Sequence, residues 1–107
     1  MKTVEAVFKE FPFLRGYKGY GGLILCLQMA AEDEERLTDI RRQLYLPAAQ
    51  LRGESLCNFE KNLRTVRDAF LMYGGREYLE TVLGHKIVLP LYPRELIEAV
   101  LECMKEE

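Results

Sequence analysis

The hydrophobic positions of this chain recur at three- and four-residue steps over most of its length, which is the spacing of amphipathic helices. The clearest case is the segment 54–75, where the apolar positions fall at helical intervals: Leu56, Phe59, Leu63, Val66 and Phe70. Strict alternation of apolar and polar residues, the pattern of a half-buried strand, is nearly absent. The pattern therefore predicts an all-α fold.

Cap and turn residues divide this pattern into a compact domain of six or seven helices. Thr3 is placed to cap a short first helix, and Pro12 ends it. Pro47 is expected to stop one helix and open a short one, with Gly53 at its C-terminal end. The segment 85–93 is expected to be extended or looped. The predicted helices span residues 4–11, 23–37, 35–46, 47–52, 54–75, 76–83 and 94–107.

Length and composition predict one ordinary globular domain. The chain has 107 residues, of which 49% are hydrophobic and 30% charged. Its longest apolar run, residues 21–31, is too short to span a bilayer, and its N-terminus lacks the apolar core of a signal peptide. The three cysteines form no C-x-x-C pair, which argues against a zinc site and suits a reducing cytoplasm. We therefore expect a soluble, cytoplasmic protein with no membrane contact.

Enzyme signatures are weak. His85 is the only histidine, and a catalytic triad or metal site would need partners that the sequence does not supply. The glycine-rich stretch "RGYKGYGG" (15–22) fits neither the Walker loop nor the dinucleotide fingerprint, so it is interpreted as a turn that leads into a helix. We expect no catalytic residues, no metal and no cofactor.

Charge is distributed unevenly along the chain. The net charge is −2, but residues 36–76 carry eight basic and four acidic residues, a local net charge of +4. The segments before and after it are both acidic. The same basic region contains the predicted short helix, a glycine-containing turn and the long helix, so it predicts a helix-turn-helix at about 47–74. A basic segment of this kind is the electrostatic footprint that a DNA duplex requires.

The polar face of the long helix carries side chains that suit the DNA major groove. With the apolar stripe inward, the opposite face presents Cys57, Asn58, Lys61, Arg64, Thr65 and Asp68. Lysine and arginine donate to guanine, asparagine pairs with adenine, and threonine bonds to either base type. The predicted base-reading residues are Asn58, Lys61, Arg64 and Thr65, and the predicted phosphate-binding residues are Arg41, Arg42, Arg52 and Arg67. The alternative is that this is only a solvated face.

These residues also carry a resemblance to a known family. The recognisable points are Lys18-Gly19-Tyr20, Leu44-Tyr45 with a nearby proline, Glu60-Lys61 with Arg64, and Leu83-Gly84. From about Phe11 to Met104 the chain resembles the C-terminal DNA-binding effector domain of the sporulation initiation factor, the stage-zero master response regulator of spore-forming bacteria.

The resemblance implies a six-helix domain that binds duplex DNA as a transcription regulator, often as tandem copies on repeated sites. In the family the long helix reads the major groove, and Lys61 and Arg64 match its basic positions. Asn58 stands where the family usually has an arginine and Thr65 where a histidine is expected, so the family's target sequence is not carried over. We expect a stand-alone effector-type domain without a receiver domain, so control by phosphorylation is not carried over either.

Together these observations predict sequence-specific binding of duplex DNA. A homodimer or tandem binding on DNA, and contact with the transcription machinery, are further partners to consider. The alternative is a protein-interaction module of the same fold that has lost DNA binding. Two questions stay open at this point. The first is whether the apolar stripe of the last helix closes the core or forms a dimer seam. The second is whether Arg15 and Lys18 only border a packed turn or also contact a DNA phosphate.

Overall fold

The computed structural model describes residues 2–106 and contains helices and turns but no strand over that range. Six α-helices alternate with short 3₁₀ and π-type segments. Their bounds are α1 (Val4–Phe8), η1 (Pro12–Gly16), α2 (Tyr20–Glu32), η2 (Glu34–Asp39), η3 (Arg41–Tyr45), α3 (Leu46–Leu51), α4 (Leu56–Phe70), η4 (Leu71–Gly75), α5 (Arg76–Leu83) and α6 (Pro93–Glu106). The all-α prediction is confirmed.

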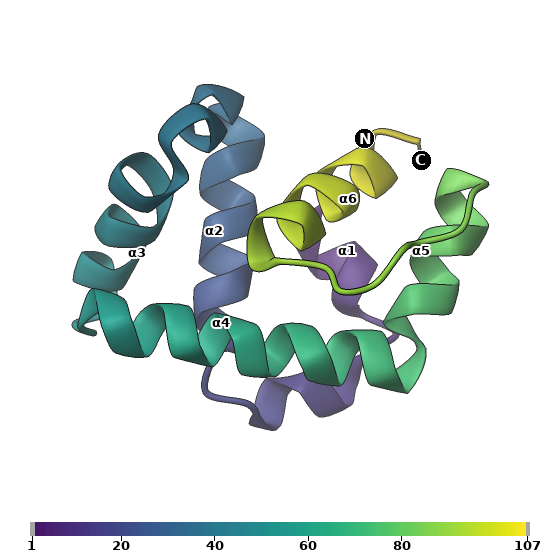
Figure 1. Ribbon diagram of the computed structural model, residues 1–107, viewed down its shortest axis with the longest axis horizontal. Helices are drawn as coiled ribbons and strands as arrows, with labels where there is room; N and C mark the ends of the chain where they lie inside the picture. The colour runs from purple at the N-terminus through teal and green to yellow at the C-terminus, as the bar shows by residue number, and fades with distance from the viewer. Residues whose placement is uncertain (1, 107) are drawn as a thin grey trace.

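The helices pack around one hydrophobic core. In Figure 1, α4 runs along one edge of the molecule, α2 and α3 rise toward one of its ends, and α5 rises at the other. Helix α6 lies between α2 and α5 and contacts both of them. The two ends of the chain lie close together, and the backbone N–H of Lys2 donates to the carbonyl of Met104 at 2.9 Å.

Aromatic side chains join α1 and the turn after it to α4 and α5. The ring centroids of Phe11 and Phe70 are 5.0 Å apart, and those of Phe8 and Phe70 are 5.5 Å apart. Tyr78 of α5 packs edge-on against Phe11 at 5.6 Å, and Tyr20 of α2 packs against Phe8 at 6.3 Å. Such pairs stabilise a core by about 0.5–1.5 kcal/mol each beyond their buried area.

The stripe of α6 is buried within the protein's own core. Its apolar residues are covered by the other helices of the same chain: Leu96, Ile97, Val100, Leu101 and Met104. This stripe therefore closes the core, the first of the two roles considered from the sequence.

Local signals placed several helix ends correctly. The Thr3 hydroxyl accepts a hydrogen bond from the backbone N–H of Ala6 at 3.1 Å and so caps α1. Gly53 ends α3 with a positive φ of 68°, and Gly84 ends α5 with a φ of 77°. Both glycines adopt the left-handed conformation that commonly follows the end of a helix.

The predicted break before Pro47 is wrong, but its predicted place in the first turn of a short helix is confirmed. The chain continues directly from the π-type turn η3 into α3, with Pro47 in the first turn of α3. Proline has no N–H to donate to the carbonyl four residues earlier, which here belongs to Gln43. The guanidinium of Arg36 donates to that carbonyl instead. A side chain from η2 therefore supplies the missing hydrogen bond, and helical structure passes through the proline.

The predicted third helix also differs. Its residues form the 3₁₀ segment η2 and the π-type segment η3 rather than one regular helix. Helix α3, the turn 52–55 and α4 follow as two consecutive helices with a tight connection. Ser55 begins α4, and its hydroxyl accepts from the backbone N–H of Asn58 at 3.2 Å.

Candidate nucleic-acid interface

The outward face of α4 is the one that the sequence predicted. The stripe residues Phe59, Leu63, Val66 and Phe70 are all at most 2% exposed. The opposite side is exposed along the whole helix: Cys57, Asn58, Lys61, Arg64, Thr65 and Asp68. The four predicted base-reading residues therefore lie together on one accessible surface, called here the α4 face.

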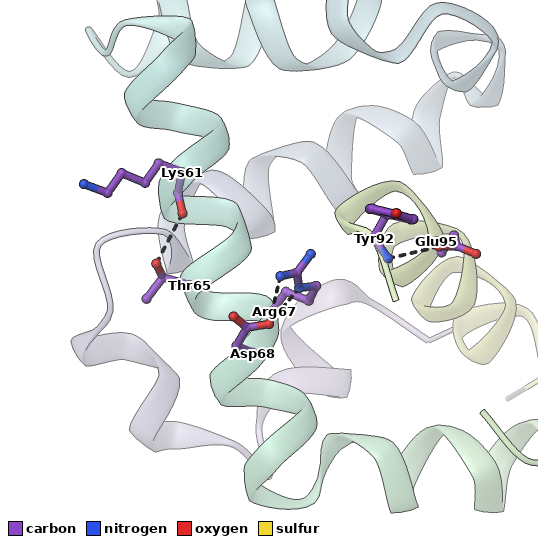
Figure 2. A network of polar contacts seen from close by, with 6 residues as sticks. All are labelled: Lys61, Thr65, Arg67, Asp68, Tyr92 and Glu95. Atoms are coloured by element: carbon purple, nitrogen blue, oxygen red, sulfur yellow. Dashed lines mark hydrogen bonds and ion pairs between the residues drawn. The ribbon is translucent and has the colours of Figure 1, made fainter. Parts of the chain in front are cut away.

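Two cations of the α4 face have no side-chain partner among the described residues. Neither Lys61 nor Arg64 forms an ion pair or side-chain hydrogen bond with any residue between 2 and 106. Figure 2 shows Lys61 extending away from the helix. The Thr65 hydroxyl donates to the carbonyl of Lys61 at 3.2 Å, so its hydrogen is already used within the helix. Its oxygen can still accept a hydrogen bond from a ligand.

All four of the predicted phosphate-binding arginines are paired with acidic side chains. Arg41 Nη2 lies 2.9 Å from Glu60 Oε1, and Arg52 Nε lies 3.0 Å from Glu54 Oε2. Arg42 has only a long contact of 3.9 Å with Asp39. Exposed pairs of this kind contribute about 0–1 kcal/mol, so an incoming phosphate can compete with the carboxylate.

Arg52 is turned toward the protein. A Cβ added to Gly21 would lie 2.5 Å from Nη1 of Arg52, so the guanidinium rests on the first turn of α2. Gly21 has no side chain there, which makes room for it. This contact holds the guanidinium against α2, and Arg52 also pairs with Glu54, which accepts a hydrogen bond from Asn62 on the flank of α4 where Gly19 packs.

Arg67 lies apart from the other predicted residues. Because a helix turns by about 100° per residue, Arg67 is displaced by about 120° from Lys61 around α4. Its side chain is 16% exposed and pairs with Asp68 at 2.9 Å. Figure 2 shows it on a different side of α4 from Lys61 and Thr65. It lines a cleft of about 770 Å³ together with the segment 89–91.

The segment before α2 packs tightly on one flank of α4. A Cβ added to Gly19 would lie 2.1 Å from the backbone oxygen of Asn62 and 3.1 Å from Cγ1 of Val66. Only glycine allows the two backbones to approach this closely. Lys18, immediately before it, and Arg15 are both exposed.

The opposite flank of α4 includes a residue that the sequence reasoning missed. Arg94, at the start of α6, lines a cleft of about 330 Å³ with Tyr45, Glu60 and Arg64. Its side chain is half exposed and pairs with Glu98 at 3.4 Å. Arg94 belongs to the acidic C-terminal third of the chain, and no local signal linked it to α4. Its position depends on the packing of α6 against α4.

The segment between α5 and α6 is held by two side chains of α5. Arg76 Nη2 donates to the carbonyl of Ile87 at 3.1 Å, and the N–H of Ile87 donates to Glu80 Oε2 at 2.8 Å. The hydrogen bond from Ile87 and the nearby Arg76 guanidinium lower the pKa of the Glu80 carboxyl, against an opposing contribution from desolvation. This clamp anchors the segment that leads to Arg94.

Burial raises the pKa of two further side chains, Cys26 and Tyr45. It raises the pKa of the Cys26 thiol in α2 to about 12. It also raises the pKa of the Tyr45 hydroxyl, with smaller contributions from Cys26 and Glu60. Both groups are therefore neutral near pH 7, and the charge of the interface comes from its arginines, lysines and carboxylates.

Residues 2–106 contain no group of three His, Cys, Asp or Glu side chains placed to hold a metal ion. His85 is exposed, with Nδ1 3.1 Å from the carbonyl of Lys86. Over the same range, no helix has the length and apolar character needed to cross a membrane.

No protein-family model, curated protein or solved structure matches this chain.

Proposed function

We propose that this protein binds duplex DNA through α4 and acts as a sequence-specific transcription regulator. The observation that carries the proposal is the α4 face, on which two cations, an amide and a hydroxyl are exposed on the helix that follows a short helix and a tight turn. This is the arrangement in which helix-turn-helix proteins present their second helix to DNA.

The dimensions suit the major groove. An α-helix with its side chains is about 10–12 Å across, and the major groove of B-DNA is about 12 Å wide. With α4 in the groove, Lys61 and Arg64 donate to guanine or phosphate and Asn58 pairs with adenine. Thr65 accepts a hydrogen bond from a base amino group, since its own hydrogen is donated to Lys61.

The proposed set of phosphate-binding residues is smaller than the set predicted from the sequence. Arg41 and Arg42 are exposed and can exchange their carboxylate partners for phosphates. Arg52 is held against α2 by its contact with Gly21, and Arg67 lies on another side of α4, so both are left out of the proposed contact set. Tandem binding on repeated sites and contact with the transcription machinery stay predictions from the family resemblance.

The proposal predicts strongly salt-dependent binding that needs Lys61 and Arg64. Fluorescence anisotropy on a pool of random duplexes at about 50 mM salt should show binding that weakens steeply as salt rises. The double substitution Lys61→Ala and Arg64→Ala should nearly abolish it. Selection of bound duplexes from the same pool then identifies the target sequence.

Lys86→Ala is the matched control, because it removes an exposed lysine that lies beyond the C-terminal end of α5. It should leave the affinity within about twofold of the wild type, since a lysine away from the DNA releases no counterions on binding. Failure of the folded wild-type protein to bind any duplex at about 50 mM salt would overturn the proposal.

A cleft at the other end of α4 supports the second candidate, a protein-interaction module. It is lined by five apolar residues and two arginines, among others: Leu71, Met72, Leu89, Pro90, Leu91, Arg67 and Arg76. Met72 is 71% exposed, so an apolar side chain of this cleft is open to a partner. This candidate replaces DNA binding if the duplex experiment fails while the protein is folded.

A further inference from the structure

The lead-in segment, residues 15–19, lies on one flank of α4, and Arg41 lies on the other. Gly19 contacts the backbone of Asn62, whereas Arg41 pairs with Glu60 at 2.9 Å. Since each residue advances about 100° around the helix, Asn62 and Glu60 lie about 100° to either side of Lys61. The α4 face is therefore bordered on both sides by segments that carry cations.

The cations of the lead-in segment are available to a ligand. Arg15 and Lys18 are exposed, and neither forms an ion pair or a side-chain hydrogen bond within residues 2–106. Arg41 in contrast already has a carboxylate partner. An incoming phosphate can therefore bind Arg15 and Lys18 without displacing a carboxylate found in residues 2–106.

The position of the lead-in segment is fixed by packing rather than by its own side chains. The close approach of Gly19 to Asn62 and Val66 holds the backbone against α4, and the backbone N–H of Tyr17 donates to the carbonyl of Leu14 at 3.0 Å. The backbone at Lys18 is therefore held beside the α4 face. Figure 2 shows the lead-in ribbon passing beside Thr65, on the side toward which Lys61 extends.

We propose that Arg15 and Lys18 form a second phosphate-binding element, which contacts the DNA strand on the opposite side of the major groove from Arg41. This inference rests on the proposed function of α4. Because α4 nearly fills the width of the groove, any segment packed alongside it lies over the edge, where the phosphates are. The lead-in segment holds one strand and Arg41 the other, so α4 is fixed between them.

The test measures how affinity depends on salt. Each neutralised phosphate contributes about −0.9 to the slope of log K against log salt concentration on duplex DNA. Lys18→Ala and Arg15→Ala should each make this slope about one unit less steep, and the double variant about two units. The order of affinities among different duplex sequences should be unchanged, since phosphate contacts do not read bases.

Two controls isolate the effect. Lys18→Arg keeps the charge and should keep the wild-type slope, whereas Lys86→Ala should not alter the slope. Circular dichroism should show wild-type helix content for every variant, because neither Arg15 nor Lys18 makes an ion pair within the described range.

The outcomes separate this inference from the proposed function. A wild type that binds DNA and needs Lys61 and Arg64, with an unchanged slope in the Arg15 and Lys18 variants, overturns this inference alone. A wild type that binds no duplex overturns both. A smaller slope that also occurs in Lys86→Ala shows a general effect of net charge and overturns the inference as well.

Discussion

Gly19 is the residue at which the lead-in segment touches α4. Its φ of −80° is open to any residue, so the requirement for glycine is steric. An added Cβ would lie 2.1 Å from the backbone oxygen of Asn62, and backbone on both sides of the contact leaves no flexible side chain to move away. The "KGY" element of the family resemblance thus has a local physical reason in this protein.

Gly19→Ala is therefore expected to destabilise the fold. Overfilling a packed contact typically costs about 1–3 kcal/mol. Urea denaturation followed by circular dichroism should show a lower midpoint with a similar slope. Gly16→Ala is the control, because an added Cβ there meets nothing within 4 Å. Equal stability of the two variants would contradict the packing described at Gly19.

Helix α4 shows how an element can be oriented by its own sequence. Its stripe of Phe59, Leu63, Val66 and Phe70 is wide enough to specify which side enters the core, and the polar side follows from it. The sequence of α4 does not specify what lies on its flanks, because that depends on which other elements of the fold pack against it. Pro47 is a similar case: the carbonyl that its missing N–H leaves without a donor is bound by Arg36, a residue eleven positions earlier.

The clamp on Ile87 makes the element between α5 and α6 sensitive to acid. The pKa of Glu80 is lowered in the folded protein, chiefly by the N–H of Ile87, so ionised Glu80 favours the folded state. This stabilisation is fully present above the ordinary glutamate pKa of about 4.5 and is lost as the pH falls through the lower folded pKa.

Glu80→Gln should accordingly reduce stability at pH 7 and have little effect at a pH below the folded pKa. Urea unfolding of wild type and variant across the acidic range measures the difference, which should shrink as the pH falls below about 4.5. Glu77→Gln, an exposed glutamate on the same helix with no ion pair within residues 2–106, is the control. A constant difference at all pH values would show that the clamp does not depend on charge.

At the scale of the whole molecule, charge and burial are arranged by contacts between distant segments. Lys105 of α6 pairs with Glu34 at 2.9 Å, and this hydrogen-bonded partner raises the pKa of the lysine. Arg94, from the acidic C-terminal third, joins the flank of α4. The protein has a net charge of −2, yet cations from separate segments gather at the α4 face and its borders.

The three cysteines differ in exposure, so their reactivity tests how the helices pack. Cys57 is exposed on the α4 face, whereas Cys26 and Cys103 are buried and the pKa of Cys26 is raised to about 12. Because the thiolate is the reactive form, a maleimide at neutral pH should label one cysteine in the native protein and three after denaturation. Mass spectrometry after proteolysis identifies the site. Rapid labelling of Cys26 or Cys103 in the native state would contradict the packing of the core.

The same label tests the orientation of α4 on DNA. A duplex bound in the proposed way should slow the modification of Cys57, because the groove covers the α4 face. Bound DNA that leaves the labelling rate unchanged would place the contact on another surface.

The sequence by itself determined the features that depend on neighbouring residues. Helical periodicity, the cap at Thr3, the glycine stops and the outward face of α4 were all predictable, because burial of an apolar stripe and hydrogen bonding at helix ends are local. Only the tertiary structure decided which cations border α4, which are paired with acids, and that Arg52 packs against α2. These features depend on segments far apart in the chain, whose packing no local pattern encodes.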